Sequence, residues 1–211
     1  MGTSTKNRHT SISIADAEKA IYVDFEGFQD QPPSLLGILV DGTLTQVVLD
    51  PRLTAAAAAK GCMTAAISDV AASLKRWCRD SGRKLVGYSQ HELRVFAEYT
   101  GVDFTAEYRD ARMIAKRWWN KCRPDAPRRD NGLKAFLEAI GRPHPAYFGE
   151  QKATSRLRAV IDMLGNRRTY KSLTPIVKSK WQMLLKYNEQ DCRGMQTLVT
   201  ISCAELASDR A

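Results

Sequence analysis

The sequence predicts an α/β fold with a mixed five-stranded sheet, a three-strand antiparallel meander and flanking helices. Three apolar segments of strand length come first, at residues 20–26, 35–40 and 44–49. Asp41-Gly42 separates the second from the third and is a strong short-range hairpin signal. Segments with helical and strand patterns then alternate, which is typical of a mixed sheet covered by helices.

The next elements follow from apolar spacing and from their stop signals. Residues 55–80 predict an amphipathic helix, since apolar side chains recur every three or four positions from Ile67 to Trp77. A short apolar strand is expected at residues 84–88, and Ser89 is placed to cap the helix that follows it. A right-handed crossover would bring the start of that helix close to the end of the first strand.

The second half of the chain has a less regular pattern. Prolines and basic residues predict a positively charged loop at about 120–130, followed by a helix at 132–140. Residues 141–180 are interpreted as a basic helical or loop insert, which wraps substrate, contacts another subunit or forms a solvated helix. Residues from 181 onward have the pattern of a final helix.

The chain has 211 residues, enough for one domain, which we place at residues 16–205 after a flexible tail at 1–15. Lys and Arg exceed Asp and Glu by nine, and the pI is about 9.4, which favours a polyanionic partner such as nucleic acid. The five cysteines are scattered and indicate neither a disulfide framework nor a zinc site. No leader or membrane segment is recognisable, so we expect a cytoplasmic protein without a membrane partner.

Two acids on the first strand are the first chemical signal. Asp24 and Glu26 are two residues apart, so an extended strand places both carboxylates on one face. Adjacent carboxylates repel each other, and sites made only of oxygen ligands are those that Mg²⁺ and Mn²⁺ prefer. The strand therefore predicts half of a metal site, and the alternative is a strand with a solvated face.

The final helix carries an acid on its apolar side. Asp191 shares a stripe with Leu184 and Met195, and Tyr187 lies one turn before it. A buried carboxylate needs compensation, so Asp191 should meet either an arginine or a metal ion. Tyr187 would place a hydroxyl beside it.

Glu92 lies in the first turn of the helix that Ser89 begins. Phe96 and Tyr99 mark the inward side of this helix, so Glu92 borders the packed face. The alternative is a solvated glutamate that stabilises the helix dipole.

Positive charge and aromatic side chains coincide after residue 110. We expect phosphates and bases to contact this region, although at least one of the two adjacent tryptophans should belong to the core. The predicted nucleic-acid contacts are Arg112, Lys116, Arg117, Trp118, Trp119, Lys121 and Arg123.

The ordered set Asp24-x-Glu26, Glu92 and Tyr187-x-x-x-Asp191 resembles the DEDD 3′–5′ exonucleases of the ribonuclease H-like superfamily, in the Tyr-x-x-x-Asp branch. The stretch at 187–192 also looks like that of the YprB-type nucleases. The resemblance spans residues 22–198, and it implies the ribonuclease H-like fold. The usual second motif is Asn-x-x-x-Phe-Asp, whereas this chain reads Tyr-Ser-Gln-His-Glu, and Asp110 competes with Glu92 as the fourth acid.

The resemblance implies two Mg²⁺ or Mn²⁺ ions and hydrolysis of phosphodiester bonds. Asp24 would bridge both ions, Glu26 and Asp191 would complete one, and Glu92 would act on the other directly or through water. Tyr187 would orient the attacking water. The expected substrate is DNA or RNA with a single-stranded 3′ end. The alternatives are a non-catalytic nucleic-acid-binding module of a larger assembly and an internally cutting endonuclease of the ribonuclease H or resolvase type.

Overall fold

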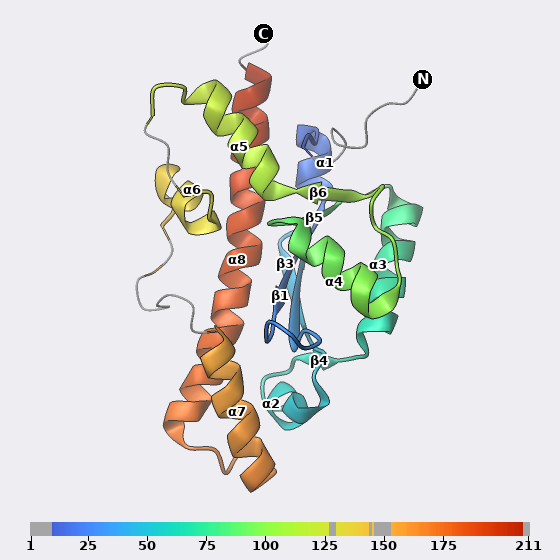
Figure 1. The fold of residues 1–211 in the computed structure, drawn as a ribbon, viewed down its shortest axis with the longest axis vertical. Helices are drawn as coiled ribbons and strands as arrows, with labels where there is room; N and C mark the ends of the chain where they lie inside the picture. The colour runs from blue at the N-terminus through green and yellow to red at the C-terminus, as the bar shows by residue number, and fades with distance from the viewer. Residues whose placement is uncertain (1–9, 127–129, 144, 146–152, 209–211) are drawn as a thin grey trace.

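A computed structural model describes residues 10–126, 130–143, 145 and 153–208 of the chain. Its centre is a six-stranded mixed sheet with the order β4-β3-β2-β1-β5-β6 (Figure 1). The strands are β1 (Ile21–Glu26), β2 (Leu35–Val40), β3 (Thr43–Val48), β4 (Met63–Thr64), β5 (Leu85–Gly87) and β6 (Tyr108–Asp110). The predicted antiparallel meander of β1, β2 and β3 is confirmed, and β5 and β6 continue the sheet in parallel with β1.

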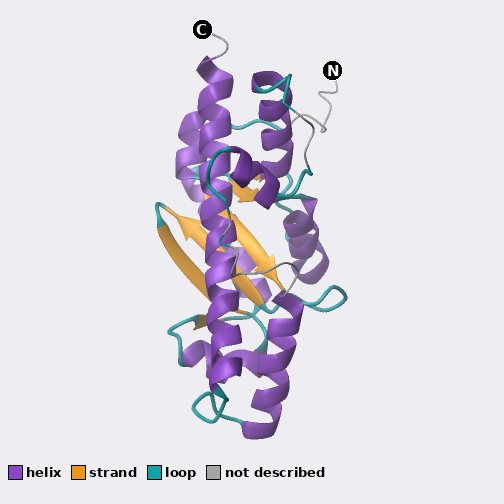
Figure 2. Cartoon of the chain, turned by 90° about the vertical axis from the view of Figure 1, so that its left-hand side faces the viewer, coloured by secondary structure: helices purple, strands orange, loops and turns teal. Residues whose placement is uncertain are grey.

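Helices cover both faces of the sheet. The long helix α8 crosses one face, as Figure 2 shows, and α3 and α4 pack on the other. The helices are α1 (Ile14–Lys19), α2 (Thr54–Ala58), α3 (Ile67–Ser81), α4 (Gln90–Thr100), α5 (Ala111–Cys122), α6 (Leu133–Ala139), α7 (Ala153–Arg167) and α8 (Pro175–Ser208), with a 3₁₀ turn at Pro51–Leu53 before α2. The predicted α/β class is therefore confirmed.

The structure differs from the prediction in the region of β4 and near the N-terminus. The helix predicted at 55–80 is confirmed at Ile67–Ser81, but it is not continuous, because the chain turns at Gly61, whose φ is 66°, and then forms β4 before α3 begins. The sheet consequently has six strands rather than five. Helix α1 begins at Ile14, inside the predicted tail, where the Ser13 hydroxyl accepts a hydrogen bond from the Asp16 amide at 3.0 Å. The first nine residues lie outside the described part of the chain.

The described part of the insert predicted at 141–180 is mainly helical. It contains all of α7, and α8 begins within it at Pro175 rather than near residue 181. Among the described residues, no helix combines the length and apolar character that a membrane span requires.

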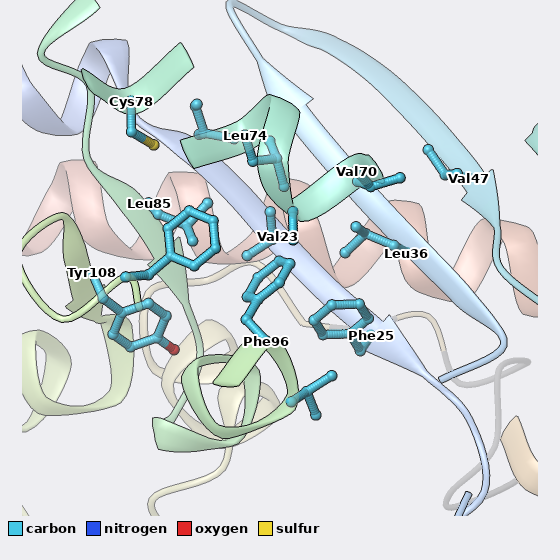
Figure 3. Close-up of a cluster of buried hydrophobic side chains, with 14 of the residues drawn as sticks. Val23, Phe25, Leu36, Val47, Val70, Leu74, Cys78, Leu85, Phe96 and Tyr108 are labelled. Carbon is cyan, nitrogen blue, oxygen red and sulfur yellow. The ribbon is translucent and has the colours of Figure 1, made fainter. Parts of the chain in front are cut away.

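The alternation along β1 sorts its side chains between two cores. Ile21, Val23 and Phe25 point toward α3 and α4, where the Phe25 and Phe96 rings meet edge to face with centroids 5.0 Å apart (Figure 3). Tyr22 packs instead with residues of α8. The predicted division of the strand is confirmed, and Asp24 and Glu26 are directed to the side of α8.

Candidate metal centre

Three carboxylates meet where β1 ends against the middle of α8. Asp24 and Glu26 come from the strand and Asp191 comes from the helix, and one oxygen of each lies within 4.8 Å of the other two. Glu26 is buried, and Asp24 and Asp191 are half-buried. The sequence motifs lie more than 160 residues apart, so only the packing of α8 on the sheet brings them together.

The acids change one another's protonation. Burial is the largest cause of the raised pKa of Asp24, and the charges of Glu26, Asp191 and Glu92 raise it further. Burial and Asp191 raise the pKa of Glu26 to about 8, while the Arg156 guanidinium from α7 opposes this rise. Without a cation, the cluster therefore binds protons near neutral pH, and a divalent cation would displace them.

A glycine lets α8 approach the sheet at this point. Gly37 on β2 lies opposite Asp24 in the antiparallel register. A Cβ atom on Gly37 would lie 2.8 Å from the Cys192 sulfur and closer still to the Asn188 side-chain oxygen. Since real Cβ atoms do not come so close, any other residue here would push α8 away from Asp24.

Asn188 occupies the space that Gly37 leaves. This fully buried residue donates hydrogen bonds from Nδ2 to the Asp24 carboxylate at 2.9 Å and to the Asp24 backbone carbonyl at 3.0 Å. The side-chain oxygen of Asn188 accepts a hydrogen bond at 3.0 Å from the side-chain amide of Gln46. Gln46 belongs to β3 and lies opposite Gly37 of β2. Asn188 thus fixes one Asp24 oxygen and leaves the other for a ligand.

Glu92 lies next to the cluster but outside the group of three. It completes a capping box at the start of α4, in which its Oε2 accepts a hydrogen bond from the Ser89 amide at 3.2 Å. The same oxygen accepts a hydrogen bond from the Tyr108 hydroxyl at 3.1 Å. Burial raises the pKa of Glu92 to about 7. Its neighbour Gly87 has no side chain, and a Cβ there would lie 2.8 Å from Oε2.

Asp110 serves a different purpose. It caps the N-terminus of α5, where its carboxylate accepts hydrogen bonds from the Met113 amide at 3.1 Å and from Gln90 at 3.2 Å. The charge of Glu92, and not that of Asp110, contributes to the raised pKa of Asp24. Glu92 is consequently the better candidate for the fourth acid.

The Tyr187 hydroxyl is hydrogen-bonded to Asp191. Burial and the three carboxylates raise the pKa of this phenol, so it stays protonated. Lys134 from α6 lies with its Nζ 5.5 Å from the centre of the Tyr187 ring. Tyr187 can therefore donate or accept a hydrogen bond at the edge of the cluster, but it is not a base.

The basic and aromatic region predicted to contact nucleic acid is largely α5. Trp118 is fully buried and its indole N–H donates to Glu205 at 2.8 Å, so its predicted contact with bases is wrong, and the expectation of one core tryptophan is confirmed. Trp119 packs edge-on against Phe136, with centroids 6.0 Å apart. Arg123 pairs with Glu205 at 2.9 Å. The remaining cations of the set, Arg112, Lys116, Arg117 and Lys121, are half-buried or exposed on α5.

A groove of about 800 Å³ begins at Glu26. The chain at 27–33, the helix α4 and the start of α7 form its walls, and Phe28, Arg94 and Tyr99 are among the lining side chains. Thr154 of α7 donates a hydrogen bond to the Gly27 carbonyl at 3.3 Å, which ties α7 to the chain immediately after Glu26. Of the three acids of the cluster, Glu26 is the one that lines this groove.

Two residues of the site were not predicted. Asn188 lies between Tyr187 and Asp191 in the last motif, and a polar residue on the inward side of a helix was the available signal. Arg156 carries no such signal, because its place beside Glu26 depends on how α7 folds back.

No protein-family model, curated protein or solved structure matches this chain.

Proposed function

We propose that the protein is a metal-dependent nuclease that hydrolyses phosphodiester bonds, with the ribonuclease H-like fold and the 3′–5′ exonuclease activity that its motifs resemble. The observation that carries this proposal is the meeting of Asp24, Glu26 and Asp191 within 4.8 Å, with Tyr187 beside them. Such a concentration of partly buried negative charge is costly unless cations bind it.

The donor set fits Mg²⁺ or Mn²⁺. All three groups offer carboxylate oxygens, and neither a histidine nor a thiolate is among them. Asp24, Glu26 and Asp191 would hold the ions, with Glu92 as a further ligand directly or through water. Bound divalent ions would lower the pKa of an attacking water and would stabilise charge on the phosphate and the leaving oxygen.

The surrounding residues position these groups. Asn188 holds one Asp24 oxygen and so presents the other to the ions. Tyr187, protonated and hydrogen-bonded to Asp191, orients the attacking water rather than removing its proton. The capping box and Tyr108 fix the rotamer of Glu92.

A nucleic-acid substrate is favoured by charge and by shape. The chain has a net charge of +9, which attracts a polyanion. The groove that Glu26 lines offers room beside this acid for a few unpaired nucleotides at the end of a strand. The aromatic side chains Phe28 and Tyr99 in this groove could stack on bases.

The test is incubation of the protein with Mg²⁺ or Mn²⁺ and with 5′-labelled and 3′-labelled single-stranded and duplex DNA and RNA. Immediate release of mononucleotide from the 3′ label supports the exonuclease, and internal fragments alone would indicate an endonuclease. D24N and D191N should each lower the rate by more than about a hundredfold. E18Q, which changes an exposed acid of α1, is the matched control. Equal rates in D24N, D191N and wild type would reject the site.

A further inference from the structure

Two acid-free segments of the chain carry positive charge in addition to the acid-free stretch 111–124, which includes α5. Residues 51–68 and 163–188 contain no Asp or Glu. Together they carry eight cationic side chains, against a net charge of +9 for the whole chain, so the remainder is almost neutral. The eight are Arg52, Lys60, Arg167, Arg168, Lys171, Lys178, Lys180 and Lys186.

The fold brings the two segments together at one end of the molecule, the lower end in Figure 1. There α2 packs against α7 and the start of α8, and the Trp181 indole N–H donates to the Ala56 carbonyl at 3.2 Å. Lys60 from the first segment and Lys178 from the second each lie with Nζ 5.9 Å from the centre of the same Tyr170 ring. The two acid-free segments thus form one surface.

The turn between α7 and α8 keeps an arginine in an unfavourable conformation. Arg168 has a φ of 61°, which costs a residue other than glycine about 1 kcal/mol or more. Its neighbours Arg167 and Lys171 are exposed with it. We define the basic end as Lys60, Arg167, Arg168, Lys171 and Lys178.

The basic end and the acid cluster are joined by one continuous helix. Lys178 and Asp191 both belong to α8 and are thirteen residues apart. At a rise of 1.5 Å per residue, they are separated by about 20 Å along the helix axis. This corresponds to about six nucleotides of a strand that is stacked as in B-form DNA, with a rise of 3.4 Å per nucleotide.

We propose that the basic end binds the phosphodiester backbone of the substrate strand about six nucleotides from the acid cluster. This inference rests on the proposed nuclease function and assigns a role to the segment of α7 and the start of α8. A group of cationic side chains without acids between them is suited to bind a polyanion with regularly spaced charges, such as the phosphates of a nucleic-acid backbone. Ile176 is exposed nearby, but a lone apolar side chain does not make the apolar face that binds a membrane.

The test is a binding measurement that needs no cleavage. Fluorescence anisotropy in EDTA would compare labelled single strands of about 4 and about 24 nucleotides, with the full-length protein. The variant K60Q/R168Q/K171Q removes three exposed charges from the basic end. The control K19Q/R76Q/R79Q removes three exposed charges from α1 and α3, at equal net charge.

We expect the basic-end variant to bind the long strand at least about tenfold more weakly, with little change for the short one. The slope of log K against log salt should shrink by about 2, since each lost contact to a single strand accounts for about 0.7. The control should stay within about twofold of wild type. Equal losses in both triple variants, or equal losses for both strand lengths, would overturn the proposal.

The outcomes separate this inference from the nuclease itself. Loss of long-strand binding in a protein that cleaves nothing would support the basic end and reject the proposed function. Cleavage by wild type together with unchanged long-strand binding in the variant would reject the basic end alone. Two further probes are vesicles that contain anionic lipid and, separately, an acidic peptide. If the protein bound either probe more tightly than the long strand, the proposed role of the basic end would also be overturned.

Discussion

The acid cluster and the basic end concentrate charge in opposite ways. In the cluster, like charges meet at buried or half-buried positions, and their mutual effect raises the pKa of Asp24 and of Glu26. At the basic end, like charges lie mostly at the surface, where water and salt screen them. The first arrangement favours the uptake of protons or of compact, highly charged cations, and the second is suited to a diffuse polyanion.

The two regions also differ in how the fold supports them. The cluster depends on close packing, since α8 reaches Asp24 only because Gly37 has no side chain. The positive charge of the basic end depends on the absence of Asp and Glu from the segments 51–68 and 163–188. Changes of packing should therefore damage the first region, and changes of charge the second.

The largest effect that separates the two regions is a pH dependence of stability in the metal-free protein. The folded pKa of Glu26, about 8, and that of Glu92, about 7, lie above the ordinary value of 4.5. The folded state then holds more protons than the unfolded state, so stability falls as pH rises from about 4.5 through about 8. The expected loss is several kcal/mol.

Urea unfolding in EDTA between about pH 5 and pH 8.5 would measure this loss. E26Q should remove much of it, whereas E18Q should not. Added Mn²⁺ should stabilise the wild type more at the alkaline end, because the ligands are already deprotonated there. A stability that rises over this range in EDTA would contradict the buried-acid interpretation.

The next effect concerns the approach of α8. G37A places a Cβ against Asn188 and Cys192, and such overpacking costs about 1–3 kcal/mol. Cleavage should fall together with stability because Asp191 moves away from Asp24. The control G165A adds a Cβ with nothing within 4 Å and should be neutral or slightly stabilising. Calorimetry and the cleavage assay would record both, and a G37A protein with full activity would show that the close approach is not needed.

A smaller effect is expected for the amide that holds Asp24. N188A should weaken Mn²⁺ binding by about 10- to 100-fold, because residues that orient metal ligands have effects of this size. Titration followed by electron paramagnetic resonance reads Mn²⁺ binding without any substrate. N166A, which changes an exposed asparagine of α7, should bind Mn²⁺ as the wild type does. Equal affinities for N188A and N166A would remove Asn188 from the site.

The smallest effect belongs to the basic end. R168G should stabilise the protein by about 1 kcal/mol, because glycine adopts the left-handed conformation of this position without strain. The same variant should bind the long single strand more weakly. R167G, at the last residue of α7, should instead destabilise, because it removes the hydrogen bond from the Arg167 guanidinium to the Ser172 carbonyl at 2.7 Å and adds backbone freedom to the unfolded chain. Unfolding and anisotropy measured on both variants would test this, and tighter strand binding by R168G would argue against a role for the charge.

Local patterns predicted those parts of the structure that depend on neighbouring residues. Alternation along β1 predicted that Asp24 and Glu26 share a face, and helical spacing predicted that Tyr187 and Asp191 do. The break at Gly61 was missed because residues 55–59 are all alanine and favour a helix whatever follows. The two-residue strand β4 is too short to produce a pattern.

The missed parts depend on contacts between distant segments. Asn188 becomes a ligand-positioning candidate only because Gly37 and Gln46 lie opposite it, more than 140 residues earlier. Trp118 and Trp119 look equally available in the sequence, and the packing of Glu205 and α6 decides which one is buried. Arg156 reaches Glu26 through the return of α7 to the sheet.

The continuity of α8 fixes the distance along the helix between the basic end and the acid cluster. Its 34 residues form one unbroken helix of about 50 Å, so Lys178 and Asp191 cannot move independently along its axis. A strand that touches both regions must exceed a minimum length that the backbone of this helix sets. Digestion from the end that occupies the acid cluster should therefore slow once about six nucleotides remain, and the size of the residual fragment would report the spacing on α8.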